Sequence, residues 1–208
     1  MIRASTLHVA RGAIQEAGSS AAIAHLLRHQ ILVEGPPDRS VLQFSHHVLF
    51  DCAVAKLLLA GPPHVLPQRL AADPGSLLMI WPSILLRFSD AWIADDNRRE
   101  FWDLVLKVVQ SPHIPEIGRL AGPTVAAQSA TTMSDLRLLS AALQSPAEED
   151  RSSAEGVVHH LLGALSAGGP DGERLVGLAA GPWYEFFESV SCNLRQSTAY
   201  IVRRFLKT

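Results

Sequence analysis

Apolar residues recur with helical spacing along most of the chain after residue 45. The clearest example is 98–110, where Phe101, Leu104, Val105 and Val108 fall on one face, as in a helix packed against a core. Proline and glycine separate this segment from its neighbours. We expect helices over 46–59, 76–92, 98–110, 115–120, 125–130, 134–144, 154–166 and 183–206, with Pro82 kinking or restarting the second.

Two predicted helix starts carry the spacing of a capping box, in which a hydroxyl residue precedes an acid by three positions. These are Thr132 with Asp135, and Ser152 with Glu155. The charged stretch 145–153 and the glycine-rich stretch 168–172 are expected to be loops between helices.

The first 44 residues show a different pattern. Apolar positions over 7–16 and 21–29 predict two short helices, and the runs 30–34 and 40–44 predict two strands. The turn-forming residues of 35–39 would connect these strands. Helix, helix, strand, turn and strand are the elements of a winged helix.

The predicted fold class is therefore mainly α, with a small α/β segment at the N-terminus. We expect a winged-helix-like segment over 1–44 and an α-helical domain over 45–208. Pairs of helices joined by short proline and glycine loops are typical of HEAT or armadillo-like solenoids. Because no repeating consensus is present, an irregular helical bundle remains the alternative for 45–208.

Composition excludes disorder and several kinds of partner. The 208 residues are 48% hydrophobic and 18% charged, and 18 basic against 20 acidic residues give a net charge of −2. A dedicated nucleic-acid binder usually has a basic excess. The longest charge-free apolar run, 75–86, is too short for the roughly 20 residues that cross a bilayer. We expect neither nucleic acid nor a membrane as a partner.

Cysteine usage points to a reducing compartment. Cys52 and Cys192 each lie in an apolar, helix-like stretch, so both are expected to be buried free thiols in a cytoplasmic protein. The tryptophans are expected to be packing anchors between helices.

Standard catalytic motifs are absent from the sequence. None of the lysines, Lys56, Lys107 and Lys207, follows a glycine, so a phosphate-binding P-loop cannot be present. The adjacent pair His159 and His160 would point about 100° apart on a helix and cannot share one metal ion in ordinary geometry. We expect no catalytic residue, no metal site and no cofactor, and hence no enzyme.

One stretch, 41–59, carries an ordered pattern. A strand ends in an aromatic residue, and a histidine, an apolar residue, an acid and a small helix residue follow it. These positions are held by Phe44, His46, Leu49, Asp51 and Ala55. The stretch resembles the end of the winged-helix region in STAND-class P-loop NTPases, which include NACHT proteins. Cys52 departs from the tyrosine or phenylalanine usual there.

The resemblance implies a function for the chain. In that family the winged helix folds back on the nucleotide-binding domain, and its histidine reaches toward the phosphates of bound ADP. By this resemblance His46 is a candidate nucleotide-phosphate sensor, provided that an NTPase domain is supplied. The chain would then be a non-catalytic regulatory or recognition module of a signalling or defence ATPase. Its expected partner is a protein, or the missing NTPase domain.

Two other classes stay open. The first is a winged-helix DNA-binding regulator with a helical effector domain, in which 21–29 would present His25, Arg28 and His29 to DNA and Arg39 would contact a phosphate. Against it, this helix has a single arginine for phosphate contacts. The second is a small helical enzyme with a site between helices, for which no constellation of residues can be named.

Overall fold

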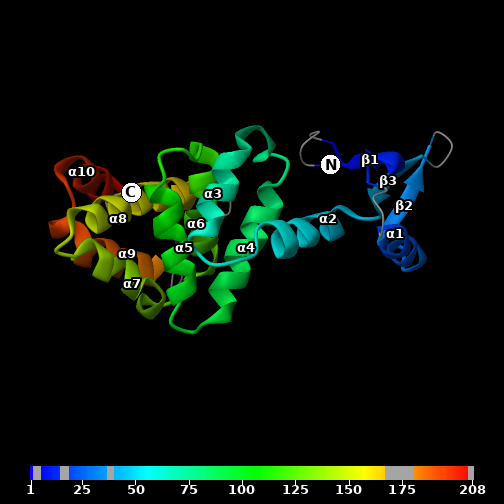
Figure 1. Cartoon of the computed structure of the whole chain (residues 1–208). Helices are drawn as coiled ribbons and strands as arrows, with labels where there is room; N and C mark the ends of the chain where they lie inside the picture. The colour runs from blue at the N-terminus through cyan, green and yellow to red at the C-terminus, as the bar shows by residue number, and fades with distance from the viewer. Residues whose placement is uncertain (2–5, 15–18, 37–39, 167–179, 206–208) are drawn as a thin grey trace.

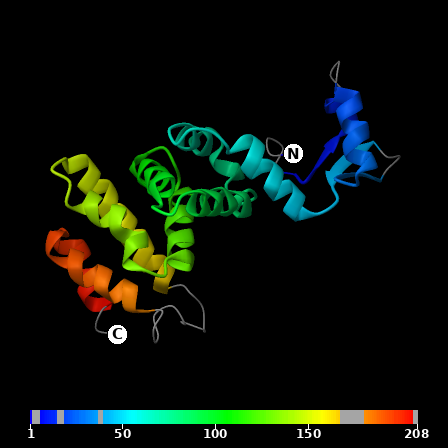
Figure 2. The same ribbon diagram turned by 90° about the horizontal axis from the view of Figure 1, so that it is seen from below.

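The computed structural model describes residues 1, 6–14, 19–36, 40–166 and 180–205 of the chain. Most of them are helical, and a three-stranded antiparallel sheet lies near the N-terminus (Figure 1). The predicted fold class, mainly α with a small N-terminal α/β segment, is confirmed. The two views show this segment at one end of the molecule, joined to the remaining helices through α2 (Figures 1 and 2).

The N-terminal unit, residues 6–44, contains β1 (His8–Ala10), a 3-10 turn (Arg11–Ala13), α1 (Ser19–Arg28), β2 (Leu32–Gly35) and β3 (Val41–Phe44). β3 lies in the middle of the sheet, whose order is β1-β3-β2. The unit buries Ile23, Leu32 and Leu42, and these side chains lie outside the main core of the molecule.

The helix predicted over 7–16 is wrong as far as the structure describes that range. Val9 lies opposite Leu42, and residues 8–10 form a strand paired with β3. Pairing with a strand distant in sequence satisfies the backbone groups that a local helix would have used. The second predicted helix and both predicted strands are confirmed as α1, β2 and β3.

The connector, residues 47–58, leads from the N-terminal unit into the helical part of the molecule. It consists of α2 (His47–Ala53) and a π-helical segment (Val54–Leu58), at the place where one helix was expected. The following helix, α3 (Val65–Ala72), was not predicted, because the prolines before and inside it masked its pattern.

Residues 81–166 and 180–205 form a stack of helices around one continuous core, to which the connector and α3 also contribute side chains. α4 packs on α6 and α6 on α8, while α7 packs on α9, and α5 lies against α4, α6 and α8. The bounds are α4 (Trp81–Ala94), α5 (Arg99–Gln110), α6 (Glu116–Ser129), α7 (Met133–Leu143), α8 (Glu148–Ser166), α9 (Gly181–Val190) and α10 (Gln196–Phe205).

Several predicted boundaries moved. Pro82 lies in the first turn of α4, so it restarts the helix there. The two short helices expected over 115–130 are the single helix α6, and the long last helix is divided by a 3-10 turn at Ser191–Asn193. The loop expected over 168–172 lies outside the described residues.

The two capping-box predictions had opposite outcomes. The box of Thr132 and Asp135 begins α7, as expected. The box of Ser152 and Glu155 is wrong, and so is the loop over 145–153, because α8 already begins at Glu148. Acidic residues in the first turn of α8 favour this earlier start, since the positive end of the helix dipole lies there.

α6 passes very close to α4 and α5. A Cβ atom at Gly122 would lie 2.5 Å from Cγ2 of Val105 and 3.1 Å from Cε1 of Phe88. Only glycine allows this approach of the helix backbone. The small residues that weakened the helical pattern of α6 therefore have a packing role.

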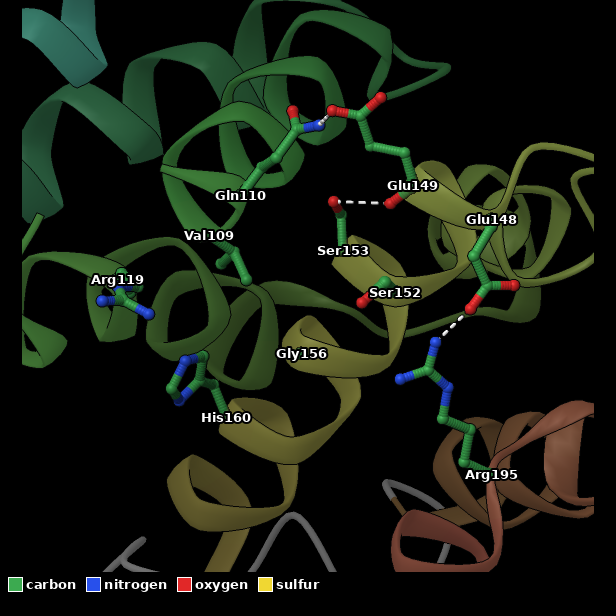
Figure 3. A pocket seen from close by; sticks show the side chains of 10 residues that line it. All are labelled: Val109, Gln110, Arg119, Glu148, Glu149, Ser152, Ser153, Gly156, His160 and Arg195. Atoms are coloured by element: carbon green, nitrogen blue, oxygen red, sulfur yellow. Dashed lines mark hydrogen bonds and ion pairs between the residues drawn. The ribbon is translucent and has the colours of Figure 1, made fainter. Parts of the chain in front are cut away.

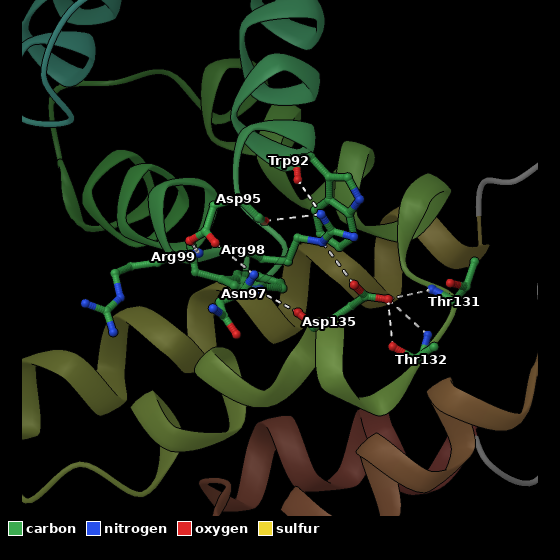
Figure 4. Close-up of polar contacts among 9 residues, drawn as sticks. Trp92, Asp95, Asn97, Arg98, Arg99, Thr131, Thr132 and Asp135 are labelled. Atoms are coloured by element: carbon green, nitrogen blue, oxygen red, sulfur yellow. Dashed lines mark hydrogen bonds and ion pairs between the residues drawn. The ribbon is translucent and has the colours of Figure 1, made fainter.

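A partly buried arginine fixes the corner between α4 and α5 (Figure 4). Arg98 has a left-handed backbone conformation, with φ of 56°, and its guanidinium lies 4.9 Å from the ring centre of Trp92. Its Nη1 donates to the carbonyls of Trp92 and Asp95, at 2.7 and 3.2 Å, and its Nε donates to Asp135 at 3.0 Å. These contacts join the end of α4 to the start of α5 and to α7.

Asp135 ties this corner to α7. Burial alone would raise the pKa of Asp135, but hydrogen bonds from Thr131, Thr132 and Arg98 outweigh burial and lower this pKa. The backbone carbonyl of Asp135 also accepts a hydrogen bond of 2.7 Å from the indole of Trp102. The carboxylate is therefore held ionised as part of the fold.

Candidate functional site

His46 lies where β3 passes into α2. Its backbone carbonyl accepts hydrogen bonds from the N–H groups of Leu49 and Phe50, at 3.0 and 3.4 Å, and so starts the helix. The imidazole is exposed and does not cap α2. Its role as a phosphate sensor remains a prediction.

The connector is clamped to α4 by two polar contacts. Asp51 accepts a hydrogen bond of 2.8 Å from the hydroxyl of Ser83, a fully buried residue of α4. One helical turn further on, Lys56 forms an ion pair of 2.6 Å with Asp90 of the same helix. Asp51 and Lys56 both belong to the patterned stretch 41–59, whereas their partners Ser83 and Asp90 were not recognised from the sequence.

The end of the connector is fixed by an arginine of the next helix. Nη1 of Arg69, on α3, donates to the backbone carbonyls of Leu58 and Ala60, which a helix end leaves without internal partners. Leu57, by contrast, is 80% exposed. The connector is thus fixed on one side and presents an apolar side chain to solvent on the other.

A mainly apolar cavity of about 870 Å³ lies at this junction. Phe44 and Phe50 form part of its wall and meet edge to face, with ring centres 5.8 Å apart. The remaining lining residues come from the start of the chain, the connector, α3 and the segment before α4: Met1, Ala53, Val54, Leu58, Leu59, Arg69, Ala72, Asp73, Ser76 and Ile80.

The exposed face of α1 is the candidate for DNA. It carries His25 and Arg28, and His29 follows directly after the helix. All three residues are exposed, and the rings of the two histidines lie 4.4 Å apart. α1 has no acidic residue in its first turn. Arg39, the fourth residue of this hypothesis, lies outside the described residues.

The prediction of two buried cysteines is wrong for Cys192. Cys52 is partly buried, but Cys192 is exposed. α9 ends at Val190, and the 3-10 turn that follows carries Cys192 out of the apolar face. The packing role expected of the tryptophans is confirmed for Trp92, Trp102 and Trp183, which are buried in the main core.

Within the described ranges, no group of three or more histidine, cysteine, aspartate or glutamate residues could hold a metal ion. Over the same ranges, no helix has both the length and the apolar character needed to span a membrane. The adjacent residues His159 and His160 lie on α8 with ring centres 5.9 Å apart.

Comparison of the chain with protein-family models, with curated proteins and with solved structures finds no match.

Proposed function

We propose that the chain is a non-catalytic regulatory and recognition module equivalent to the C-terminal part of a STAND-like ATPase. A winged-helix-like unit would dock on a P-loop NTPase domain, and the HEAT-like stack would recognise a protein partner. The observation that carries this proposal is the clamp between the connector and α4, made by Asp51 with Ser83 and by Lys56 with Asp90. Through it, a domain docked on the N-terminal unit has a defined position relative to the stack.

Two features of the fold support the proposal. The sheet order β1-β3-β2 is the strand order found in winged helices. The packing of α4, α6 and α8 on one another, with α7 on α9, is the alternate-helix contact that α-solenoids make.

The first test concerns the NTPase domain. We expect the coding DNA next to Met1 to include a P-loop segment, in frame or adjacent. That segment, co-expressed with this chain, should form a complex that retains ADP. His46→Ala should lower ADP retention, whereas His47→Ala, at the neighbouring exposed position, should leave it unchanged. Equal retention by both variants would contradict the sensor role, and the lack of any P-loop segment would contradict the NTPase partner.

The DNA-binding alternative is favoured by one observation, the exposed basic face of α1. Fluorescence anisotropy with duplex DNA over a range of salt concentrations separates the two functions. A regulator that neutralises several phosphates loses affinity steeply as salt rises. We expect no such binding. Salt-dependent binding that Arg28→Ala weakens and Arg137→Ala preserves would establish the alternative instead.

A further inference from the structure

A second cavity, of about 560 Å³, opens between α5, α6 and α8, on the part of the stack away from the connector. Its volume is within the range of small-molecule sites in proteins. Arg119 and His160 lie on one wall, and the ion pair of Glu148 with Arg195 lies opposite them (Figure 3). Gly156 of α8 also lines the cavity and adds no side chain to it.

The acidic residues of this cavity already have partners. Glu149 accepts a hydrogen bond of 2.6 Å from the side-chain amide of Gln110. Glu148 binds both Arg151 and Arg195, and these hydrogen bonds lower the pKa of its carboxyl group. Glu148 is thus paired with two arginines, and the carboxylate of Glu149 is hydrogen-bonded to a neutral amide.

Arg119, unlike Glu148, has no partner of opposite charge in the part of the chain that the structure describes. Its Nε donates to the backbone carbonyl of Ile114 at 2.8 Å, which fixes the orientation of the guanidinium. Among the described residues, no carboxylate forms an ion pair with it, whereas Arg195 on the opposite wall has two such partners. The two Nη groups of Arg119 are therefore available to bind a ligand.

His160 adds a second donor beside Arg119. Burial lowers the pKa of His160, with His159 and Arg119 acting in the same direction and Glu116 acting against them. The imidazole is therefore neutral at neutral pH and keeps one N–H to donate. The influence of Arg119 on His160 also agrees with their position side by side in Figure 3.

We propose that this cavity binds the oxyanion of a small ligand, a carboxylate or a phosphate group, through the guanidinium of Arg119 and the imidazole of His160. The Nη1–Nη2 edge of the Arg119 guanidinium, which the bond from Nε to Ile114 leaves free, matches both kinds of oxyanion in bidentate geometry. The hydroxyl of Ser152 lines the same cavity and offers a polar contact to the rest of the ligand. The site depends on the cavity alone and is independent of the NTPase partner proposed above.

The test is a calorimetric titration of the full chain at constant ionic strength, once with inorganic phosphate and once with succinate. At least one anion should bind saturably, and the better of the two identifies the group for which the site is built. Arg119→Gln should weaken this binding by about tenfold or more, the value of one charge-assisted contact. Arg137→Gln, on the exposed side of α7, should leave it unchanged.

A second pair of variants tests the site independently, in case Arg119→Gln does not fold. His160→Gln keeps an N–H donor but loses the imidazole, so it should weaken binding by a smaller factor, while the exposed His159→Gln should have no effect. Thermal melts without ligand identify any variant that has lost its fold. The proposal would be overturned if neither anion bound saturably, or if the Arg119 and Arg137 variants bound equally well.

Discussion

The N-terminal unit and the helical stack are stabilised to very different extents. Among its described residues, the unit buries three large apolar side chains of its own, those of Ile23, Leu32 and Leu42. The stack, by contrast, has a continuous core that also includes side chains of the connector and α3. Small domains bury too little surface to be stable alone without other support. The unit therefore depends on the connector for its order, and the stack does not depend on the unit.

This difference explains the form of the connector. A plain helix would join the two parts without fixing its own rotation on the stack. Here Asp51 and Lys56 bind α4, and Arg69 donates to the carbonyls of Leu58 and Ala60 at the end of the connector. Phe44 of β3 packs on the edge of the main core and meets Phe50 of α2. The weaker part is thus attached to the stronger one at several points.

The largest effect is expected from a cavity in the stack. Trp102 is 1% exposed, and its indole donates to the carbonyl of Asp135, so Trp102→Ala removes both packing and a hydrogen bond. It should lower the free energy of unfolding by about 3–5 kcal/mol. Urea denaturation followed by far-UV circular dichroism measures this loss. A change below about 1 kcal/mol would contradict the central position of Trp102 in the core.

The matching change in the N-terminal unit should act locally. Leu42 is fully buried on the central strand of the small sheet, so Leu42→Ala leaves a cavity there. It should lower the free energy of unfolding of the N-terminal unit by about 2–4 kcal/mol. Hydrogen exchange read by mass spectrometry should show rapid exchange over 8–44 and unchanged protection in α5, α6 and α8. Loss of protection throughout the chain would show instead that the two parts unfold together.

A smaller loss is expected when the carboxylate at the corner between α4 and α5 loses its charge. The free energy of unfolding should fall by about 2 kcal/mol, the value of hydrogen bonds to an ionised group. The change is Asp135→Asn. Because the pKa of Asp135 is lower in the folded chain, its contribution is present above the unfolded value of 3.8 and is lost as the pH falls through the folded value. The difference in stability between parent and variant, measured at several pH values, should therefore shrink in acid. Asp103→Asn, which removes the charge from the partly exposed ion pair of Asp103 with Lys107, is the control.

Two glycines provide the smallest and most specific comparison. Gly122→Ala forces a Cβ against Val105 and Phe88 and should destabilise the chain by about 1–3 kcal/mol. Gly163→Ala, in α8, meets no atom within 4 Å and should stabilise the chain by about 0.5–1 kcal/mol. Thermal melts of the two variants should shift in opposite directions, and a shift in the same direction would contradict the packing of α6.

The sequence predicted what depends on local pattern. The face of 98–110 is strongly periodic, and α5 lies there with its expected residues buried. The strand at 8–10 could not be predicted, because the strand with which it pairs lies more than 30 residues away at 41–43. The start of α8 was missed because its first turn is charged and carries no apolar pattern.

The candidate sites, too, were predicted only where their residues follow one another in a local sequence pattern. His46 and Asp51 belong to one continuous pattern and were found, although the partner of Asp51, Ser83, was not. Arg119 and His160 lie on different helices, and neither residue has a pattern of its own. Only the packing of α6 on α8 brings them to one cavity.

The central claim is that the connector fixes the N-terminal unit on the stack, and a distance between the two parts tests it most directly. Spin labels at Ser20→Cys in α1 and at the exposed Cys192, in a chain that also carries Cys52→Ser, allow this distance to be measured by pulsed electron resonance. The account predicts one narrow distance distribution, which Asp51→Ala broadens and Asp103→Ala does not. A broad distance distribution in the chain that keeps Asp51 would contradict the claim that the connector fixes the N-terminal unit on the stack.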